Sequence, residues 1–525
     1  MKSMPGLTDK TRDELLAANQ IQAQRIADLE AKIAWFEEQF RLAKHQQFGA
    51  SSERSVPEQP NLFNEAEAVV DAAPQEPETE HISYERRKFN GQREAKLENL
   101  PVDDIDYVLA EDEQVCPQCS GRLHEIGIET RRELRLIPAQ QVVVRHNQHK
   151  YACRHCQQEE TSTPIVTAPM PKPAFPNSLA SASAVAHVMA QKFVMGIPLY
   201  RQEQQFARQG FELSRQTMAN WMIKGADWLT IVYGRMRRIL LERDILHADE
   251  TVLQVLNEPG RAAQTDSYMW LYRSGRYGPP IVLFEYQPGR SGQYPEAFLE
   301  GFEGFLHADC YGGYNRLHED KVILSGCLAH ARRKFDEALK VLPASARKNA
   351  NSLPRIGLDY FGELYQVERD LADATPEQRY LTRIERGKPI LDRFKTWLDA
   401  LAPQVLPKGA LGKAIGYCLG NWTKLTNFLL DGRLEVDNNR AERSIKPFVI
   451  GRKNWLFAST PRGAKASAII YSLVETAKEN RLDPFAYLTY LFETLPNIDM
   501  QDQAALDRLL PWADHLPISR RPSTL

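Results

Sequence analysis

Three acidic residues that lie far apart in the sequence have the chemistry needed to hold metal ions. Asp249 lies in the apolar run ILHADETVL, and Asp309 lies in FLHADCYGGY, where two glycines closely follow the acid. Glu442 is the lone acid of the basic segment RAERSIKP. Magnesium prefers carboxylate oxygens, and a pair of such ions assists both the attacking and the leaving oxygen in phosphoryl transfer. The three acids are therefore candidate ligands for Mg²⁺ or Mn²⁺.

Each acid also has a structural interpretation when it is considered alone. Side chains alternate along a strand, so Glu250 faces away from Asp249, and Asp249 is the preferred ligand. Asp309 is equally typical of an aspartate that stabilises a turn. Glu442 is equally typical of a solvated ion pair with a neighbouring base. The metal site therefore requires the fold to bring all three acids together.

The segment around Glu442 predicts a short helix. Asp437 is placed to cap it, and Pro447 is expected to end it after about Lys446. Polar side chains on and beyond this helix are candidates for holding DNA phosphates, or for orienting them: Asn438, Asn439, Arg440, Lys446, Arg452 and Lys453. Trp455 is a candidate for stacking on an unpaired base, with packing in the core as the alternative.

Two C-x-x-C pairs predict a structural zinc ion. The pairs are CPQC and CRHC, and the segments between them alternate in the manner of β-strands, as in RRELRLIP and QQVVVRHNQHKYAC. Four thiolates make a closed tetrahedral zinc site, whereas a redox function would need one pair only. The expected zinc ligands are Cys116, Cys119, Cys153 and Cys156.

A helix-turn-helix pattern follows the cysteine pairs. The first helix is expected to end at Gly210, and Ser214 is expected to cap a second helix. The start of the second helix carries side chains that bind phosphates and base edges: Arg215, Gln216, Thr217 and Asn220. Because helical hairpins are common, this pattern by itself is also compatible with an ordinary pair of helices.

The elements that position Asp249 and Asp309 read as three strands, a helix and a fourth strand. The strands are DILHADETVLQVL, SYMWLYRS, PIVLFEYQ and GFLHAD, with the helix YPEAFLEGF before the last of them. This order matches the start of a ribonuclease-H-like fold, with one acid on the first strand and one just after the fourth. Residues 331–435 show helical periodicity only and predict an insertion ahead of Glu442.

The remaining features concern size, charge and the N-terminal segment. The chain has 525 residues and a net charge of −2, but residues 56–80 are acidic and rich in proline, which predicts an extended linker. Apolar residues at heptad spacing over residues 11–45 predict a coiled coil, or alternatively a helix packed on its own chain. No run of about 18 apolar residues occurs, so no membrane span is expected. Seven cysteines, four of them in two C-x-x-C pairs, favour a reducing compartment and a bound metal over disulfides, so a cytoplasmic protein is expected.

Three motifs together resemble the transposases of the insertion sequence 66 family, which are of the DDE type. They are HADET, LHADCYGGYNRL and VDNNRAERSIKPFVIGRKNWLF, and the resemblance extends over nearly the whole chain. It includes FGASSE, both cysteine pairs, PLYRQEQQFARQG and RLDPFAYLTYLFETLP. The resemblance implies that Asp249, Asp309 and Glu442 are the catalytic acids.

The segment CLAHARRKF resembles a C-x-x-H element that follows the second aspartate in several groups of DDE transposases. It makes Cys327 and His330 candidates for supporting the active site or binding DNA, and Arg332 and Arg333 candidates for phosphate contacts. A second zinc site here would need two further ligands that the sequence does not identify.

The expected fold is a multidomain α+β chain whose catalytic α/β domain is ribonuclease-H-like and carries a helical insertion. Its expected parts are a coiled coil (1–55), an acidic linker (56–85), a zinc ribbon (86–165), a helix-turn-helix region (166–240), the catalytic domain (241–330 and 436–480), the insertion (331–435) and a C-terminal helical region (481–525).

The resemblance implies a DNA transposase that binds the terminal inverted repeats of an insertion sequence. It would cleave and transfer strands by two-metal phosphoryl transfer. The expected partners are double-stranded DNA, further copies of the chain and accessory proteins of the same element, in the cytoplasm at the nucleoid. The alternatives are a non-catalytic DNA-binding regulator derived from a transposase, and a metal-dependent nuclease that joins no ends.

Overall fold

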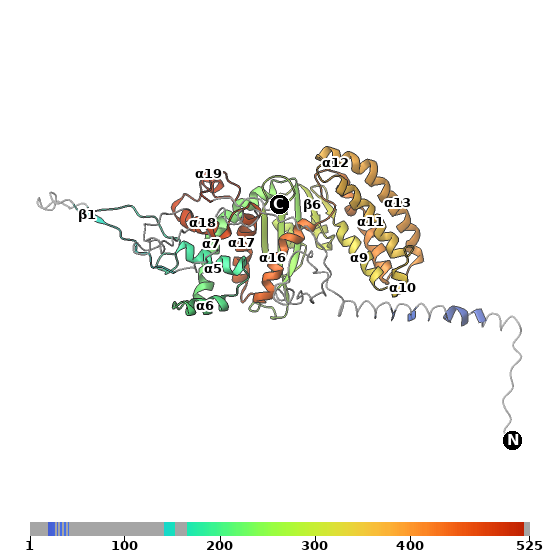
Figure 1. The fold of residues 1–525 in the computed structure, drawn as a ribbon, viewed down its shortest axis with the longest axis horizontal. Coiled ribbons are helices and arrows are strands. Elements are labelled where there is room, and N and C mark those ends of the chain that lie inside the picture. Colours follow the sequence, from blue (N-terminus) through green and yellow to red (C-terminus); the bar gives the residue numbers. More distant parts are fainter. Residues whose placement is uncertain are drawn as a thin grey trace, which may run out of the picture. The chain divides into compact units, whose positions relative to one another are not determined.

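The computed structural model describes residues 141–152 and 165–518, together with residues 19–20, 22–26, 29, 32–33, 36–37 and 40 (Figure 1). The chain divides into two compact units, one of residues 53–169 and the other of residues 1–52 and 170–525. Within the described residues, no helix is both long enough and apolar enough to cross a membrane.

A five-stranded mixed sheet forms the centre of the larger unit (Figure 1). The strands β3 (Ile245–Gln254), β4 (Asp266–Ser274) and β5 (Val282–Gln287) form an antiparallel meander. The strands β6 (Gly304–Ala308) and β7 (Val322–Gly326) run parallel to β3, and the order across the sheet is β5-β4-β3-β6-β7. The four strands predicted from the sequence are confirmed, and β7 is a fifth that the sequence analysis did not identify.

Helices cover the sheet and close its outer edge. The helix α17 (Pro461–Glu479) lies along β5 and packs on α7 (Arg215–Leu241), while α16 (Asn439–Trp455) packs on β3 and β4. The Val282 N–H donates to Thr476 Oγ1 at 3.0 Å, and the Phe284 N–H donates to Ser472 Oγ at 2.7 Å. These side chains satisfy backbone groups that an edge strand would otherwise offer to another chain.

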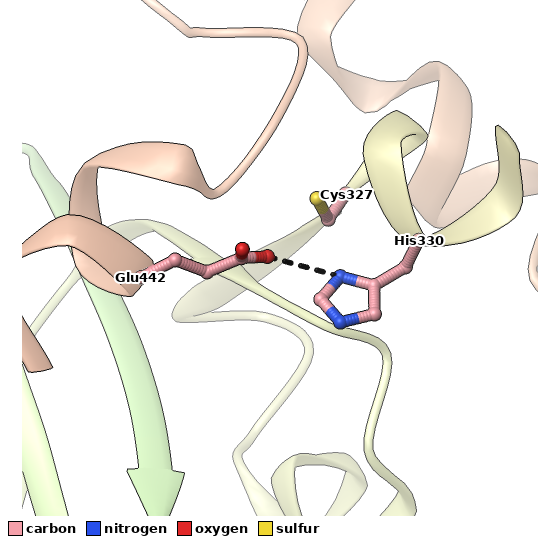
Figure 2. Close-up of side chains that lie close together, drawn as sticks. All are labelled: Cys327, His330 and Glu442. Carbon is pink, nitrogen blue, oxygen red and sulfur yellow. Dashed lines mark ion pairs between the residues drawn. The ribbon is translucent and has the colours of Figure 1, made fainter. Parts of the chain in front are cut away.

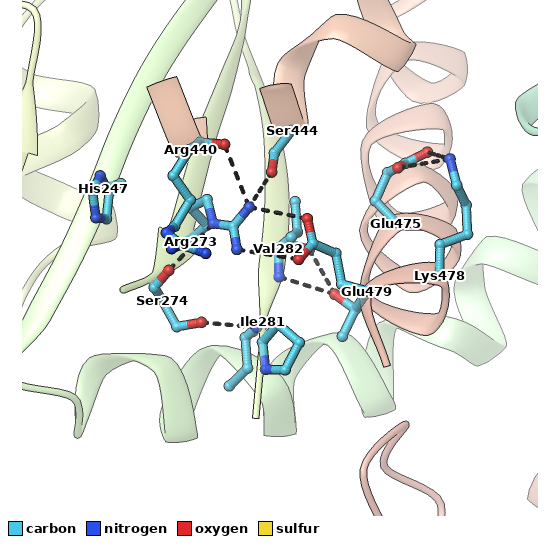
Figure 3. Close-up of polar contacts among 12 residues, drawn as sticks. His247, Arg273, Ser274, Ile281, Val282, Arg440, Ser444, Glu475, Lys478 and Glu479 are labelled. Carbon is cyan, nitrogen blue, oxygen red and sulfur yellow. Dashed lines mark hydrogen bonds and ion pairs between the residues drawn. The ribbon is translucent and has the colours of Figure 1, made fainter. Parts of the chain in front are cut away.

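A buried arginine joins the sheet to two of these helices (Figure 3). Arg273 on β4 is 2% exposed, and its guanidinium donates to Glu479 Oε1 of α17 at 3.1 Å. The same group donates to Ser444 Oγ and, at 3.4 Å, to the Arg440 carbonyl, both in α16. Because a buried guanidinium must find acceptors, this contact fixes α16 and α17 against β4.

The helices after β7 form a bundle beside β6 with its own apolar core (Figure 1). Its main members are α9 (Leu328–Lys340), α11 (Leu353–Asp370), α13 (Lys388–Leu401), α14 (Ala410–Gly420) and α15 (Trp422–Thr426). Phe335, Phe361 and Phe394 pack on one another at its centre. The absence of strand alternation between residues 331 and 435 correctly predicted a helical segment.

The other helices of this unit flank α7 or are short. They are α5 (Ala182–Phe193), α6 (Leu199–Arg208), α8 (Gln293–Phe298), α10 (Ala344–Arg347), α12 (Pro376–Thr382), α18 (Pro484–Thr494) and α19 (Gln503–Asp507). The predicted turn between α6 and α7 is confirmed, because Gly210 has a φ of 81° and Ser214 Oγ accepts from the Thr217 N–H.

The helix that carries Glu442 is longer than predicted. Pro447 was expected to end it, but α16 continues to Trp455. A proline inside a helix costs about 3 kcal/mol. The buried face of the same helix, which includes Ala441, Ile445 and Phe448, packs on the sheet and outweighs that cost. The prediction failed because it weighed the local penalty without the packing.

The smaller unit contains an antiparallel pair, β1 (Lys150–Ala152) with β2 (Ile165–Thr167). The predicted strand over QQVVVRHNQHKYAC is shorter than expected, because residues 141–149 show no strand pairing within the described part of this unit. Val142, Val143 and Val144 are exposed, so no apolar face holds them in a sheet. The four cysteines of the predicted zinc site lie outside the described residues.

The described residues between positions 19 and 40 are helical, as predicted. Apolar side chains of the predicted heptad pattern are more than half exposed there: Ile26, Leu29, Ile33, Phe36 and Phe40. Their pairing with a second chain stays a prediction.

Candidate active site

The strand register explains why Asp249 and Asp309 lie together. The sequence LHAD lies within β3 and recurs at the end of its parallel neighbour β6, where Asp309 directly follows the strand, and His247 is paired directly with His307. The two imidazole rings are stacked with centroids 5.1 Å apart. Each aspartate follows two residues later, so Asp249 in the middle of β3 and Asp309 just after β6 lie on the same face of adjacent strands.

The electrostatics of Asp249 show how crowded these acids are. Burial raises the pKa of Asp249 well above its usual value, and the negative charges of Glu250 and Asp309 raise it further. Glu442 adds a smaller contribution of the same sign. One hydrogen bond, from the Glu250 N–H to Asp249 Oδ1 at 2.9 Å, acts in the opposite direction. We define the acid cluster as Asp249, Asp309 and Glu442.

Asp309 is held by its own loop and by the helical bundle. Its Oδ1 accepts from the Tyr311 N–H at 2.9 Å, and its carbonyl accepts from the Tyr417 hydroxyl of α14 at 2.8 Å. Its Oδ2 lies 3.9 Å from the Arg290 guanidinium. Sequence reasoning missed Arg290, because only the folded chain brings the loop after β5 to the end of β6.

Glu250 is occupied by structural contacts. Its carboxylate accepts from Arg290 Nε at 2.8 Å and from the Tyr314 hydroxyl at 2.8 Å. The Arg290 guanidinium in turn stacks on the Tyr311 ring at 3.8 Å. These contacts support the preference for Asp249 over Glu250 as a metal ligand, which stays a prediction.

Glu442 lies in the first turn of α16 and faces α9 (Figure 2). Its Oε1 is 3.5 Å from His330 Nδ1, and its Oε2 is 3.8 Å from the Arg333 guanidinium. The alternative ion pair with Arg440 is wrong, because Arg440 instead donates to Glu435 at 2.7 and 2.9 Å.

Asn438 is the anchor that brings α16 to the sheet. It is 1% exposed, its Oδ1 lies 2.9 Å from His247 Nδ1, and its Nδ2 donates to the Ala248 carbonyl at 2.8 Å. Its backbone N–H donates to Cys327 Sγ at 3.1 Å. The prediction that Asn438 contacts DNA is therefore wrong: its side chain is buried and bonded to β3 directly before Asp249.

The start of α16 also differs from the predicted cap. Asn438, and not Asp437, is the residue before the first helical one, and its side chain makes no capping bond. Asp437 Oδ1 accepts from the Asn439 N–H at 3.1 Å. The half-buried Asn439 therefore contributes its backbone to this turn, and its predicted contact with DNA stays a prediction.

A second set of charges near the acid cluster is fully paired. His247 Nε2 lies 3.2 Å from Glu435 Oε2, and Glu435 also binds Arg440. Burial alone would raise the pKa of Glu435, but the hydrogen bonds from Arg440 and His247 outweigh it and hold the pKa below its usual value. We call His247, Arg273, Glu435, Asn438 and Arg440 the paired network. Arg440 thus stabilises the fold through Glu435, and its predicted phosphate contact stays a prediction.

Two further residues beyond Glu442 are engaged in the fold. Arg452 donates to the Val252 carbonyl and, at 3.2 Å, to Thr251 Oγ1, so its guanidinium is bound to β3 and not directed to a phosphate as predicted. Trp455 packs on Phe448 with ring centroids 5.5 Å apart, which supports the alternative of core packing.

The other predicted DNA contacts lie on the surface. Exposed side chains are Arg215, Gln216 and Asn220 at the start of α7, Arg332 and Arg333 on α9, and Lys446 and Lys453 on α16. Thr217 is half-buried, and its hydroxyl lies 2.9 Å from Ser214 Oγ. Each of these contacts stays a prediction.

The chemistry of the acid cluster fits a divalent cation. All of its donors are carboxylate oxygens, which are the ligands that Mg²⁺ and Mn²⁺ prefer. Burial is the main cause of the raised pKa of Asp249 and neighbouring negative charges add to it, so a bound cation would favour the ionised carboxylate.

Four family models match the chain. "Transposase IS66 family" matches residues 177–466, and the "zinc-finger binding domain of transposase IS66" matches residues 113–157, a range that includes all four cysteines of the C-x-x-C pairs. The "IS66 C-terminal element" matches residues 472–512, and "Transposase C of IS166 homeodomain" matches residues 35–105. The match of the zinc-finger model to residues 113–157 supports a structural zinc ion.

Related proteins occur in Sinorhizobium fredii (strain NBRC 101917 / NGR234). The uncharacterized protein y4jD is 33% identical over 419 residues, which cover 78% of this chain and 79% of the relative. The uncharacterized protein y4hP is 29% identical over 433 residues, covering 78% of this chain and 75% of the relative. On the match to residues 177–466 and the identity with y4jD, the chain belongs to the IS66 family of transposases, with DNA as its partner.

Proposed function

We propose that this chain is a catalytically active DNA transposase that cuts and transfers strands at the ends of its element. The observation that carries the proposal is the convergence of Asp249, Asp309 and Glu442 from two adjacent strands and a helix more than 100 residues further along the chain. Acids that lie close together in a partly buried site cost stability, and active sites are where such a cost is typically met.

The fold of the catalytic domain is proposed to be ribonuclease-H-like. Three antiparallel strands followed by two parallel ones, with β3 central, support this assignment. In such an arrangement one acid lies on the central strand and another at the end of its parallel neighbour, where Asp249 and Asp309 lie.

The chain's own residues would perform four tasks in the reaction. The three carboxylates would hold two magnesium ions, which when bound supply charge stabilisation to the attacking and leaving oxygens. Asn438 holds α16, and so Glu442, against β3. Tyr417 and the Tyr311 N–H hold Asp309. Exposed bases near the cluster, such as Lys446, would hold DNA phosphates.

Recognition of the terminal inverted repeats is assigned to the zinc-finger segment and to the start of α7, where the exposed Arg215, Gln216 and Asn220 support a contact with a DNA groove. Exposed apolar residues of the N-terminal helix, such as Ile33 and Phe36, support pairing with another copy of the chain. The proposal also includes accessory proteins of the same element as partners. The chain is proposed to act in the cytoplasm at the nucleoid.

A strand-transfer assay tests the catalytic proposal. The purified chain would be given labelled, pre-cut DNA from the flanks of its coding region, target DNA and magnesium. Asp309→Asn and Glu442→Gln should each lower strand transfer by about a thousandfold or more, because each removes a metal ligand. The control is Asp320→Asn, an exposed acid outside the cluster, which should leave the rate unchanged.

Two outcomes would contradict the proposal. If Asp309→Asn joins ends as fast as the unmodified chain, the assignment of that acid is wrong. If the unmodified chain binds the repeats and never joins them, the chain is a DNA-binding regulator; if it only cuts them, it is a nuclease.

A further inference from the structure

Three potential metal ligands meet between α9 and α16 (Figure 2). They are Cys327 Sγ, a nitrogen of His330 and a carboxylate oxygen of Glu442, and all three atoms lie within 4.8 Å of one another. Cys327 and His330 form a C-x-x-H pair at the start of α9, but two ligands do not make a site. The third comes from α16 and is close only in the folded chain.

Two of these atoms lack the partners that buried polar atoms normally have. His330 Nδ1 and Glu442 Oε1 are both buried, and neither has a hydrogen-bond partner among the described residues. Most buried polar side-chain atoms are hydrogen-bonded, and an exception calls for an explanation such as an ion. The two atoms face each other at 3.5 Å, which is the separation of an ion pair but not of a well-formed hydrogen bond.

The separation of these two atoms matches that of two ligands on one ion. Zinc binds nitrogen and oxygen at about 2.0–2.2 Å, and a tetrahedral angle then places two such atoms about 3.3–3.5 Å apart. The sulfur edge of a tetrahedral site is slightly longer, at about 3.6 Å. Small rotations of the half-exposed His330 and Glu442 side chains therefore suffice to complete the site.

Burial raises the pKa of the Cys327 thiol to about 12, so a bound metal would have to displace its proton, but two contacts act in the opposite direction and favour the thiolate. Its sulfur accepts the Asn438 N–H at 3.1 Å and also interacts with the His330 N–H. Cys327 immediately precedes the first residue of α9, where the helix dipole favours negative charge. Contacts of this kind to a ligand atom orient it and tune the metal site.

We propose that Cys327, His330 and Glu442 bind a zinc ion that joins α9 to α16 and fixes the Glu442 carboxylate. A sulfur, an imidazole nitrogen and a carboxylate oxygen form a mixed donor set that suits zinc better than magnesium. Three protein ligands leave the fourth position to water. The fixing of a catalytic acid rests on the proposed function, whereas the binding of zinc does not.

The test is the zinc content of the purified full-length chain, measured by elemental analysis after dialysis against trace zinc. With one ion in the zinc-finger segment and one here, the unmodified chain should hold about two zinc ions. Cys327→Ser and His330→Ala should each hold about one, and so should Cys116→Ser, which disables the other site. The double variant Cys116→Ser/His330→Ala should hold none.

The matched control is Cys418→Ser. Cys418 is another buried free thiol in the helical bundle, but it is not part of the cluster, so its loss should leave the zinc content at about two. Circular dichroism would establish that each variant is folded. As a measurement that needs no variant, zinc added to the zinc-depleted, folded chain should bind in two resolved steps.

The proposal is wrong if the unmodified chain holds about one zinc ion, or if Cys327→Ser and His330→Ala hold as much zinc as the unmodified chain. This result is separable from the proposed function. A chain that transfers strands with one zinc ion refutes the second zinc site alone. A chain that holds two zinc ions and joins no DNA refutes the catalytic proposal alone.

Discussion

Two polar regions share strand β3 and helix α16, and they treat charge in opposite ways. In the paired network, Arg273, Glu435 and Arg440 each have an oppositely charged partner, and Asn438 uses both amide atoms. In the acid cluster two residues further along β3, burial raises the pKa of Asp249, and the like charges of Asp309 and Glu442 raise it further. This difference indicates that polar residues with partners within the chain stabilise the fold. The acids of the cluster, in contrast, would gain a further opposite charge from a bound cation.

The largest expected effect on stability is in the paired network. Arg273→Ala removes a buried guanidinium and leaves Glu479 and Ser444 without their donor. Breaking a buried ion pair costs about 3–5 kcal/mol, and partial hydration of Glu479 places the loss at about 3 kcal/mol. Denaturant unfolding measures it. Arg316→Ala, which breaks an exposed pair with Glu296, should cost less than about 0.5 kcal/mol. Equal losses in the free energy of unfolding for Arg273→Ala and Arg316→Ala would show that the buried network contributes no more to stability than an exposed ion pair.

Asn438→Ala should lower both the stability of the fold and the rate of strand transfer, because Asn438 belongs to the paired network and holds the helix of Glu442. It removes the bonds to His247 and to the Ala248 carbonyl, which costs about 2 kcal/mol. Because Asn438 holds the helix that carries Glu442, strand transfer should fall by about a hundredfold, with DNA binding retained. Asn351→Ala, which changes an exposed asparagine of the helical bundle outside every predicted site, is the control and should change both quantities little. A variant that loses stability but keeps its full rate would show that Asn438 does not position Glu442.

Asp249→Asn should increase the free energy of unfolding, in contrast to the two substitutions above, because it removes a charge that the fold disfavours. In the absence of metal, unfolding of the variant should require about 1 kcal/mol more than that of the unmodified chain. Since the pKa of Asp249 is raised in the folded state, the gain should be full at pH values above that pKa. It should disappear as the pH falls below about 4, where the carboxyl is protonated in both states.

Magnesium should reverse the order of stability, so that the unmodified chain becomes more stable than Asp249→Asn. The ion binds only the folded acid cluster, so it should stabilise the unmodified chain and leave Asp249→Asn nearly unchanged. Thermal unfolding with and without magnesium measures the difference. Equal stabilisation of both proteins by magnesium would show that Asp249 is not a ligand.

The smallest expected effect on stability belongs to an exposed base near the cluster. Lys446→Ala should change the free energy of unfolding by less than about 0.5 kcal/mol. It should weaken DNA binding equally for all sequences and reduce the salt dependence of binding by about one phosphate contact. Lys348→Ala, an exposed lysine in the helical bundle, should do neither. Identical salt dependence in all three proteins would exclude Lys446 from the DNA-binding surface.

The parts of the fold that sequence predicted are those with strong local patterns. The four predicted strands are apolar-rich runs separated by turn signals, and Ser214 is a well-marked start for α7. Helix α16 was predicted too short, because its buried face overrides Pro447. The partners of Asn438, Arg440 and Arg452 could not be predicted, because each of them is set by contact with β3 or with the loop before α16.

The candidate site shows the same division. The three acids were identified because each lies in a distinctive motif, and the resemblance to a family linked them. Arg290 and Tyr417 lie in segments without such marks and reach Asp309 only through the folding of the chain. The proximity of Glu442 to Cys327 and His330 likewise depends on packing between α9 and α16, which no local pattern encodes.

The late position of α16 has a consequence for the order in which the protein is made. Domains fold as they leave the ribosome, starting from the N-terminus. A growing chain that has been released only as far as α15 already carries the start of α7 and the two aspartates of the acid cluster, but it has no Glu442. The proposed acid cluster can therefore form only after the last sixth of the sequence has begun to leave the ribosome, whereas the start of α7 is available much earlier.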